Sequence, residues 1–300
     1  MSKRLHAGLI ALAMLCALLA SMPLQAADPR QLTWCEFDLP PMYVPDLPRI
    51  GKGSVDRQVA FLISKLPEYD HRVQLSNLAR VAEQMRKHEQ VVCAGLQKNE
   101  ERETYMYFSE AFMATAAPKL LLQRRTLERM KSFLNSAGEV RLQDVIERST
   151  LVLGLTAGRS YGRRVDELLS RYSSGHPRIM LRQSGADLSQ GVARMMALQR
   201  VDYTIAFSSE IPLMRDAASQ PGSENELLTL PLEGMPRYVP VYITAPRDEW
   251  GLRFITRINA LLRQYWADPE FRRYAHLGQD PATREAAEAA LREINPNLRR

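Results

Sequence analysis

Ser160 has the sequence context closest to a catalytic motif, because residues 158–162 read GRSYG. A G-x-S-x-G pattern between a predicted strand and a predicted helix is typical of the nucleophile turn of serine hydrolases. Such an enzyme also needs an acid and a histidine, and Asp248 and His276 follow later in the chain. No HGGG-like segment precedes Ser160 to form an oxyanion hole, and His276 lies in a charged helix end. We therefore keep hydrolysis only as an alternative function.

Histidine and cysteine spacing gives no sign of a metal or cofactor site. The histidines are dispersed, and neither HExxH nor CxxC occurs. We therefore predict no metal and no cofactor. Of the three cysteines, Cys16 lies in the apolar N-terminal run, which leaves Cys35 and Cys93. An even number in an oxidising compartment permits a disulfide, while two buried free cysteines are the alternative.

The N-terminus has the pattern of a secretory signal peptide. Residues 3–4 are basic, residues 7–22 are almost entirely apolar, and residues 26–27 are small. The apolar run is shorter than the roughly 20 residues of a spanning helix, which disfavours a membrane anchor. We predict a cleaved signal peptide over residues 1–26, export to the periplasm, and a mature chain of 274 of the 300 residues.

Charge along the remaining chain is mixed. The net charge of +6 falls to +4 when the two basic residues of the signal peptide are removed. Basic and acidic residues alternate closely, as in residues 100–103 (EERE), which indicates an ordinary solvated surface. Nucleic-acid binding requires a basic stripe with interleaved aromatic residues, and none occurs. We predict a soluble monomer that does not bind nucleic acid.

Strand-like and helix-like segments alternate along the chain. This order predicts an α/β fold with largely parallel sheets. A further helical segment is expected after residue 281. The expected strands are residues 32–37, 71–75, 90–96, 119–123, 151–155, 178–182, 203–207 and 238–244, and the main expected helices are residues 54–66, 77–87, 142–147, 162–172, 188–198 and 249–274.

Residues 94–112 read AGLQKNEERETYMYFSEAF, in which AG, ER, FS and an aromatic residue follow at fixed distances. This segment resembles bacterial extracellular solute-binding proteins of family 3, the group that includes polar amino-acid receptors. Weaker similarities occur in the expected order over residues 30–277. They are residues 38–42 (like a PPF turn), 151–166 (like VGVxxGTT), 199–202 (like GRID) and 259–274 (like the closing helices).

The resemblance implies a two-lobed, type II periplasmic-binding-protein-like fold that closes around a ligand by bending at a two-strand hinge. One lobe is expected to comprise residues 28–113 and 238–277, and the other residues 114–237. Residues 278–300 form a helical tail in this scheme. The resemblance also implies that the strands carrying Cys35 and Cys93 lie side by side.

Arg102 matches the family arginine that holds the ligand carboxylate, and a planar guanidinium suits bidentate contact with that group. Ser160 matches a hydroxyl residue at the start of a helix, where free N–H groups favour an anion. The same resemblance implies a lining of Glu36, Asp38, Met42, Gly95, Gln97, Tyr161 and Phe207. For several of these, turn formation or core packing is an equally good interpretation.

One position departs from the family pattern. Amino-acid receptors usually carry an aspartate shortly after GRID, where it binds the α-ammonium group of the ligand. Phe207 occupies this position here, followed by Ser208 and Ser209. We therefore expect an anionic or polar-aromatic ligand rather than a common α-amino acid.

The resemblance favours a binding protein that performs no chemistry, serving a membrane permease of an ABC-type importer. A sensing module that is read by a membrane partner is an alternative with the same ligand clamp. A few members of this fold are dehydratases, for which Glu36 or Asp38 is the candidate acid or base.

Overall fold

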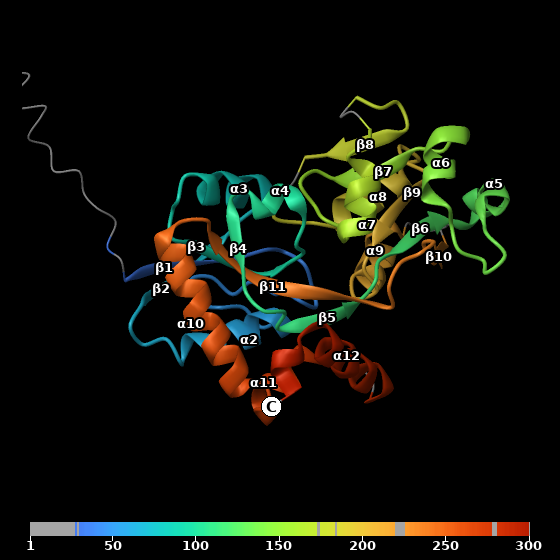
Figure 1. Cartoon of the computed structure of the whole chain (residues 1–300). Coiled ribbons are helices and arrows are strands. Elements are labelled where there is room, and N and C mark those ends of the chain that lie inside the picture. Colours follow the sequence, from blue (N-terminus) through green and yellow to red (C-terminus); the bar gives the residue numbers. More distant parts are fainter. Residues whose placement is uncertain are drawn as a thin grey trace, which may run out of the picture.

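The computed structural model describes residues 28, 30–172, 175–183, 185–219, 226–277 and 281–299. The predicted signal peptide, residues 1–26, and Cys16 within it lie outside the described residues. Two α/β lobes lie side by side, one at the left and below and the other at the upper right of Figure 1. None of the described helices is both long enough and apolar enough to cross a membrane.

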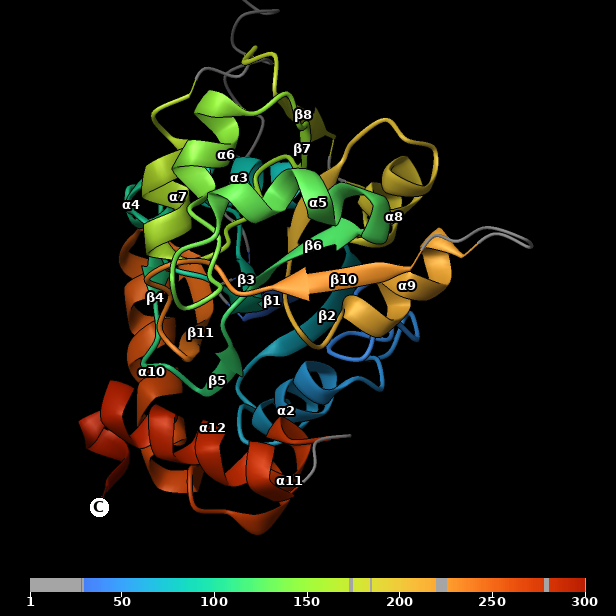
Figure 2. The ribbon, with the colours of Figure 1, turned by 90° about the vertical axis from the view of Figure 1, so that its right-hand side faces the viewer.

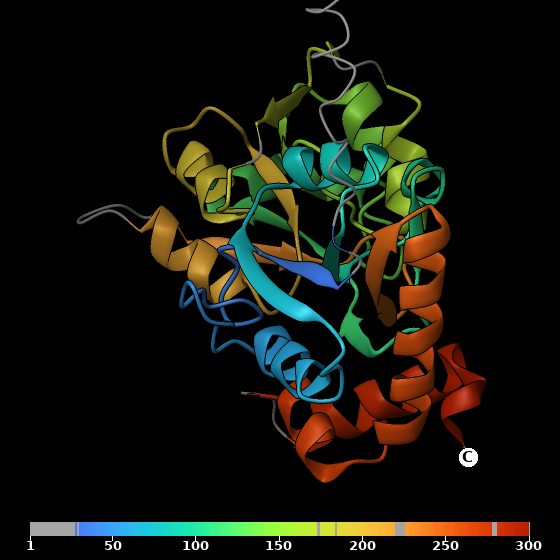
Figure 3. The same cartoon turned by 90° about the vertical axis from the view of Figure 1, so that its left-hand side faces the viewer.

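The first lobe is built on a six-stranded sheet. Strand β1 lies between β2 and β3, parallel to both, and β11 runs antiparallel to β3. In order, the strands are β2 (Asp70–Leu75), β1 (Gln31–Glu36), β3 (Val91–Leu96), β11 (Tyr238–Pro246) and β4 (Met106–Phe108), and β5 (Met113–Ala116) pairs with the beginning of β11. The helices of this lobe are α2 (Ser54–Ile63), α3 (Leu78–Arg86), α4 (Glu100–Glu103), α10 (Glu249–Tyr265) and α11 (Pro269–Ala275). Figure 3 shows β2, in light blue, at the edge of this sheet.

The second lobe is built on a five-stranded sheet. Its strands, in order, are β10 (Leu227–Leu230), β6 (Lys119–Gln123), β9 (Tyr203–Ala206), β7 (Leu153–Thr156) and β8 (Ile179–Arg182). Its helices are α5 (Leu127–Met130), α6 (Leu142–Arg148), α7 (Arg163–Leu169), α8 (Gln190–Ala197) and α9 (Ile211–Ala218), with 3-10 turns at Arg124–Thr126 and Lys131–Phe133. Figure 2 shows β10 and β6 side by side at the face of this lobe.

The central strands of both sheets are apolar runs rather than alternating patterns. In β3, five of six residues are buried, and all four residues of β7 are buried. This composition is expected for strands that helices cover on both faces. Each lobe consequently has its own buried apolar side chains. Trp34 and Phe254 belong to the core of the first lobe, and the second lobe has one cluster with Tyr203 and another with Met196.

Two strands connect the lobes. The chain passes from β5 of the first sheet into β6 of the second, and returns from β10 into β11. Strands β5 and β11 are paired, with Met113–Ala116 facing Tyr238–Val241 in antiparallel register. The predicted fold class, two α/β lobes with a two-strand connection, is therefore confirmed, whereas the lobe boundaries given above stay a prediction.

The helical region expected over residues 249–274 consists of two helices in the structure. Helix α10 ends at Tyr265, and α11 begins at Pro269. Asp268 accepts hydrogen bonds from the backbone N–H groups of Glu270 (2.8 Å) and Phe271 (3.2 Å). An aspartate cap followed by proline at the first helical position starts a new helix.

The C-terminal segment forms helix α12 (Pro281–Ile294) and a final 3-10 turn, Pro296–Arg299. Leu291 of α12 packs with Ala111, Ala114 and Trp266. The helix contacts both connecting strands, β5 and β11, and lies beneath β5 in Figures 1 and 2. Buried Glu288 pairs with Arg272 and His276, which ties the tail to the first lobe.

Cys35 and Cys93 form a disulfide. They are register partners on the neighbouring parallel strands β1 and β3, and their Cα atoms lie 5.1 Å apart. This separation is within the range that a disulfide requires. The disulfide interpretation is confirmed, and that of two free cysteines is wrong.

The disulfide closes a loop of 58 residues. In the chain-entropy description, a cross-link of this span contributes about 4 kcal/mol to the free energy of unfolding. We predict that Cys35→Ala/Cys93→Ala lowers the free energy of unfolding by up to this amount in urea titration under oxidising conditions. With reductant present, the wild type should approach the variant, and equal stability under both conditions would contradict the prediction.

Candidate functional site

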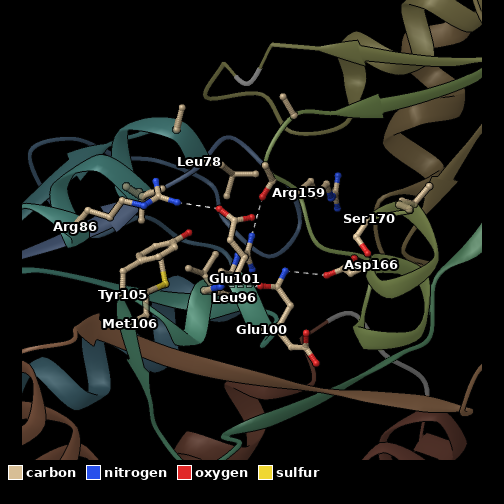
Figure 4. Close-up of a pocket in the computed structure, with 18 of the residues that line it drawn as sticks. Leu78, Arg86, Leu96, Glu100, Glu101, Tyr105, Met106, Arg159, Asp166 and Ser170 are labelled. Carbon is tan, nitrogen blue, oxygen red and sulfur yellow. Dashed lines mark hydrogen bonds and ion pairs between the residues drawn. The ribbon is translucent and has the colours of Figure 1, made fainter. Parts of the chain in front are cut away.

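Two adjoining cavities lie between the lobes. The inner cavity has a volume of about 60 Å³, and the outer cavity about 660 Å³. Residues Leu78, Leu96, Arg102 and Arg159 line both of them, so the two cavities share a wall. Figure 4 shows the outer cavity, with Tyr105 and Arg86 on the side of the first lobe and Asp166 and Ser170 on the side of the second.

Arg102 lies where the two cavities meet. It belongs to the short helix α4, whose N-cap residue Asn99 accepts a hydrogen bond from Arg102 N (2.9 Å). The guanidinium is buried, with Arg102 only 6% exposed, and it donates to the carbonyl oxygen of Gln97 (2.6 Å). It also donates to the carbonyl of Gly158 in the second lobe (2.9 Å). Arg102 therefore joins the two lobes through its side chain.

Among the described residues, no carboxylate forms an ion pair with Arg102. Burial lowers the pKa of Arg102, because desolvation disfavours the charged form. An arginine nevertheless stays protonated in proteins. The junction of the cavities therefore holds a buried positive charge whose two protein partners are neutral carbonyl groups.

Asp166 organises the second-lobe wall opposite Arg102. Its carboxylate accepts hydrogen bonds from Ser160 Oγ (2.5 Å) and from Tyr161 N (2.8 Å). Asn99 of the first lobe also donates to it (2.9 Å), which gives a second polar contact between the lobes. Ser160 thus stands at the turn before α7, where the sequence predicts it, with its hydroxyl already bonded.

The hydrolase alternative finds no support in this geometry. The Ser160 hydroxyl donates to a carboxylate, whereas a nucleophile needs a basic partner for its proton. Asp248 caps helix α10 by accepting from Gly251 N (2.7 Å), and His276 pairs with Glu288 beside the tail. The three candidate residues therefore have separate structural roles.

A buried ion pair between Arg159 and Glu210 forms the floor of the inner cavity. Glu210 accepts two hydrogen bonds from Arg159 Nη2 (2.8 and 2.9 Å) and one from the backbone N–H of Phe207 (2.7 Å). The guanidinium carbon of Arg159 also lies 5.6 and 5.5 Å from the ring centres of Tyr161 and Phe207. Sequence reasoning missed both partners, because Glu210 comes three residues after the position where the family carries its aspartate.

Six of the nine predicted site residues line the inner cavity: Met42, Gly95, Gln97, Arg102, Ser160 and Phe207. The other three do not line either cavity. Asp38 forms a backbone bridge with the second lobe, donating from its N–H to Ala186 O (3.0 Å). Tyr161 is buried, and its hydroxyl accepts from Thr156 N (3.5 Å).

Glu36 lies behind the site rather than in it. Its side chain is buried, and one oxygen accepts from Gly51 N (2.7 Å) while the other has no partner. Burial raises the pKa of Glu36 to about 7, and the nearby acids Asp56 and Asp46 contribute to the rise. Burial raises the pKa of Asp56 as well. Two buried acids therefore support the loop between β1 and α2, which carries Met42 to the inner cavity.

Within the described part of the chain, no three histidine, cysteine, aspartate or glutamate residues gather as a metal site. No protein-family model and no curated protein matches the sequence.

Solved structures do share the fold. A structure reported for glutathione import in Streptococcus mutans matches with a TM-score of 0.59 and 12% identity, over 82% of this chain and 93% of that one. A putative L-cystine ABC transporter from Listeria monocytogenes matches with a TM-score of 0.61 and 14% identity, over 82% of this chain and 94% of that one. An ancestral amino acid-binding protein, a precursor of cyclohexadienyl dehydratase, matches with a TM-score of 0.55 and 14% identity, over 82% of this chain and 93% of that one. The resemblance noted in the sequence is therefore confirmed at the level of the fold.

The Arg159–Glu210 pair yields a stability prediction. Removing one member of a buried ion pair typically costs about 3–5 kcal/mol, because the remaining charge is left without its partner. We expect Glu210→Gln to lower the free energy of unfolding by about this amount in urea titration. The double variant Arg159→Met/Glu210→Gln should recover most of the loss. Additive losses in the double variant would contradict the coupling.

The pKa of Glu36 yields a pH prediction. A carboxyl pKa of about 7 in the folded state, against an ordinary value of 4.5, means that the native state binds a proton more tightly than the unfolded state. Stability therefore falls as pH rises from about 4.5 to 7, by about 3 kcal/mol at most. Glu36→Gln should remove this part of the fall, as measured by urea titration from pH 5 to 8.

The exposed acid Glu128 provides the matched control, since Glu128→Gln should leave the pH profile unchanged. A Glu36→Gln profile parallel to that of the wild type would contradict the elevated pKa.

Proposed function

We propose that the mature chain is a periplasmic solute-binding protein that captures a small carboxylate-bearing molecule by closing its two lobes. The buried guanidinium of Arg102 carries the proposal, because it stands between the lobes with carbonyl partners and forms no ion pair with a carboxylate of the described residues. A carboxylate is the group that a guanidinium binds most specifically, through two parallel charge-assisted hydrogen bonds.

Contacts across the cleft support closure as the mechanism. Arg102 reaches Gly158, Asn99 reaches Asp166, and Asp38 bonds to Ala186, all from the first lobe to the second. A ligand shifts the equilibrium toward the closed arrangement only by as much as it binds that arrangement more tightly than the open one. A carboxylate on Arg102 that also contacts the second-lobe wall would have this preference.

Binding without chemistry is the part of the proposal that separates this chain from an enzyme. The hydroxyl of Ser160 is held by Asp166, and Glu36 lies behind the site with a backbone partner. Glu210 is neutralised by Arg159. These three groups therefore already have partners, which suits a receptor better than a hydrolase or a dehydratase.

We further propose that the closed form docks on the membrane permease of an ABC-type importer and that the chain acts as a monomer. The fold is shared with structures named for glutathione import and for an L-cystine ABC transporter, which supports transport.

A thermal-shift screen of the mature protein against carboxylic acids, amino acids, peptides and sugars tests the function, because a ligand of the native state raises the melting temperature. For a carboxylate found in this way, Arg102→Ala should weaken binding about 10- to 150-fold in calorimetry, equivalent to about 1.5–3 kcal/mol for a hydrogen bond to a charged group. The exposed Arg253→Ala is the control and should bind normally. Ligand binding that survives in Arg102→Ala, or no ligand in the whole panel, would remove the proposed role.

A further inference from the structure

The two cavities differ about tenfold in size, and this difference bears on the ligand. Sites for small molecules usually have volumes of about 300–1,000 Å³. The outer cavity, at about 660 Å³, falls in this range, whereas the inner cavity, at about 60 Å³, does not. Because Arg102 lines both cavities, a carboxylate bound to it leaves the rest of a ligand free to occupy the outer one.

Resting on the proposed function, we infer that the ligand is an elongated zwitterion of the size of a short peptide. Its carboxylate binds Arg102, and its ammonium group lies in the outer cavity. The charges on the walls of the two cavities support the placement of the carboxylate and of the ammonium group.

The surroundings of Arg102 disfavour an ammonium group close to the bound carboxylate. Burial lowers the pKa of Arg102, the nearby acids Asp166 and Glu101 raise it, and Arg159 lowers it further. The acids of this region already accept hydrogen bonds. Asp166 accepts from Ser160, Tyr161 and Asn99. Glu101 is paired with Arg86, and Glu210 is paired with Arg159. In a free α-amino acid, the ammonium group is attached to the carbon next to the carboxylate, so it would lie beside two cations and near acids that already have hydrogen-bond partners.

The outer cavity has acids that lack such partners. Arg86 pairs with Glu101 (2.8 Å) and covers the ring of Tyr105, with 4.0 Å from its guanidinium carbon to the ring centre. Figure 4 shows this pair on the first-lobe side. Glu100 of α4 and Glu167 of α7, by contrast, line the cavity from different lobes and form no side-chain hydrogen bond or ion pair with the described residues.

In the inferred complex, Glu100 and Glu167 therefore hold the ammonium group from opposite lobes. Arg163 precedes Glu167 by one helical turn and also lines the outer cavity. The mouth of the cleft thus presents both signs of charge. A zwitterion with separated charges fits this arrangement better than a polycation or a simple anion.

Oligoglycines provide a probe in which only the separation of the charges changes. We expect calorimetry to show affinity rising about tenfold or more from glycine to triglycine, as the ammonium group reaches the outer acids. N-acetyl-triglycine, which lacks the ammonium group, and triglycinamide, which lacks the carboxylate, should both bind more weakly than triglycine.

The variant Glu100→Gln/Glu167→Gln should weaken triglycine binding about three- to tenfold, as expected for partly exposed ion pairs, and leave N-acetyl-triglycine unaffected. The control Glu128→Gln/Glu249→Gln changes the net charge equally at exposed positions outside both cavities and should bind normally.

Two results would overturn the inference and leave the proposed function intact. One is Arg102-dependent binding of glycine or a small monocarboxylate as tight as that of triglycine. The other is unchanged triglycine binding in the double variant. Failure of every compound in the thermal-shift panel would instead overturn the proposed function itself.

Discussion

The buried guanidinium of Arg102 determines which polar groups must lie around it between the lobes, because a charge in a poorly solvated place requires polar partners. Gln97 supplies one carbonyl from the same lobe and Gly158 supplies another from the opposite lobe. Gly158 has a φ of +73°, a backbone conformation that glycine adopts without strain. One side chain thus couples the turn after β7 to the helix α4, and the position of each lobe depends on the other.

The second arginine of the cleft illustrates the opposite situation. Arg159 is paired with Glu210 and packed near the rings of Tyr161 and Phe207. Its charge is therefore already balanced within the second lobe and does not need a ligand. A buried ion pair adds little to the net free energy of folding. In some proteins it instead favours one packing arrangement of the core over others. The two arginines that line both cavities therefore differ: Arg159 is paired with Glu210, whereas Arg102 bonds to two carbonyl groups.

Much of the fold could be predicted from the sequence, because buried parallel strands such as β3 and β7 are unbroken apolar runs. Arg102 and Ser160 could be placed because short motifs surround them. The sequence does not predict the strands β4, β5 and β10 or the helix α9, because segments of three to eight residues carry little periodicity. The Arg159–Glu210 pair joins residues 51 apart in the chain. Arg159 lies in the GRSYG segment, but that pattern points to Ser160, and no local pattern marks Glu210. Only the assembled lobe brings the two residues together. The same holds for Glu36, whose neighbours Gly51 and Asp56 come from the loop and helix that follow β1.

Helix α12 adds a mechanical consequence to the two-strand connection. It contacts β5 and β11 together, and Asn295 near its end reaches the carbonyl of Ala111 (3.4 Å). The helix packs along both strands and holds them to the first lobe. In the proposed closure we expect bending at the short stretch beyond this helix, where Ala117 N donates to Arg237 O (3.1 Å). If the lobes close as proposed, a hinge this short should restrict the second lobe to one direction of rotation.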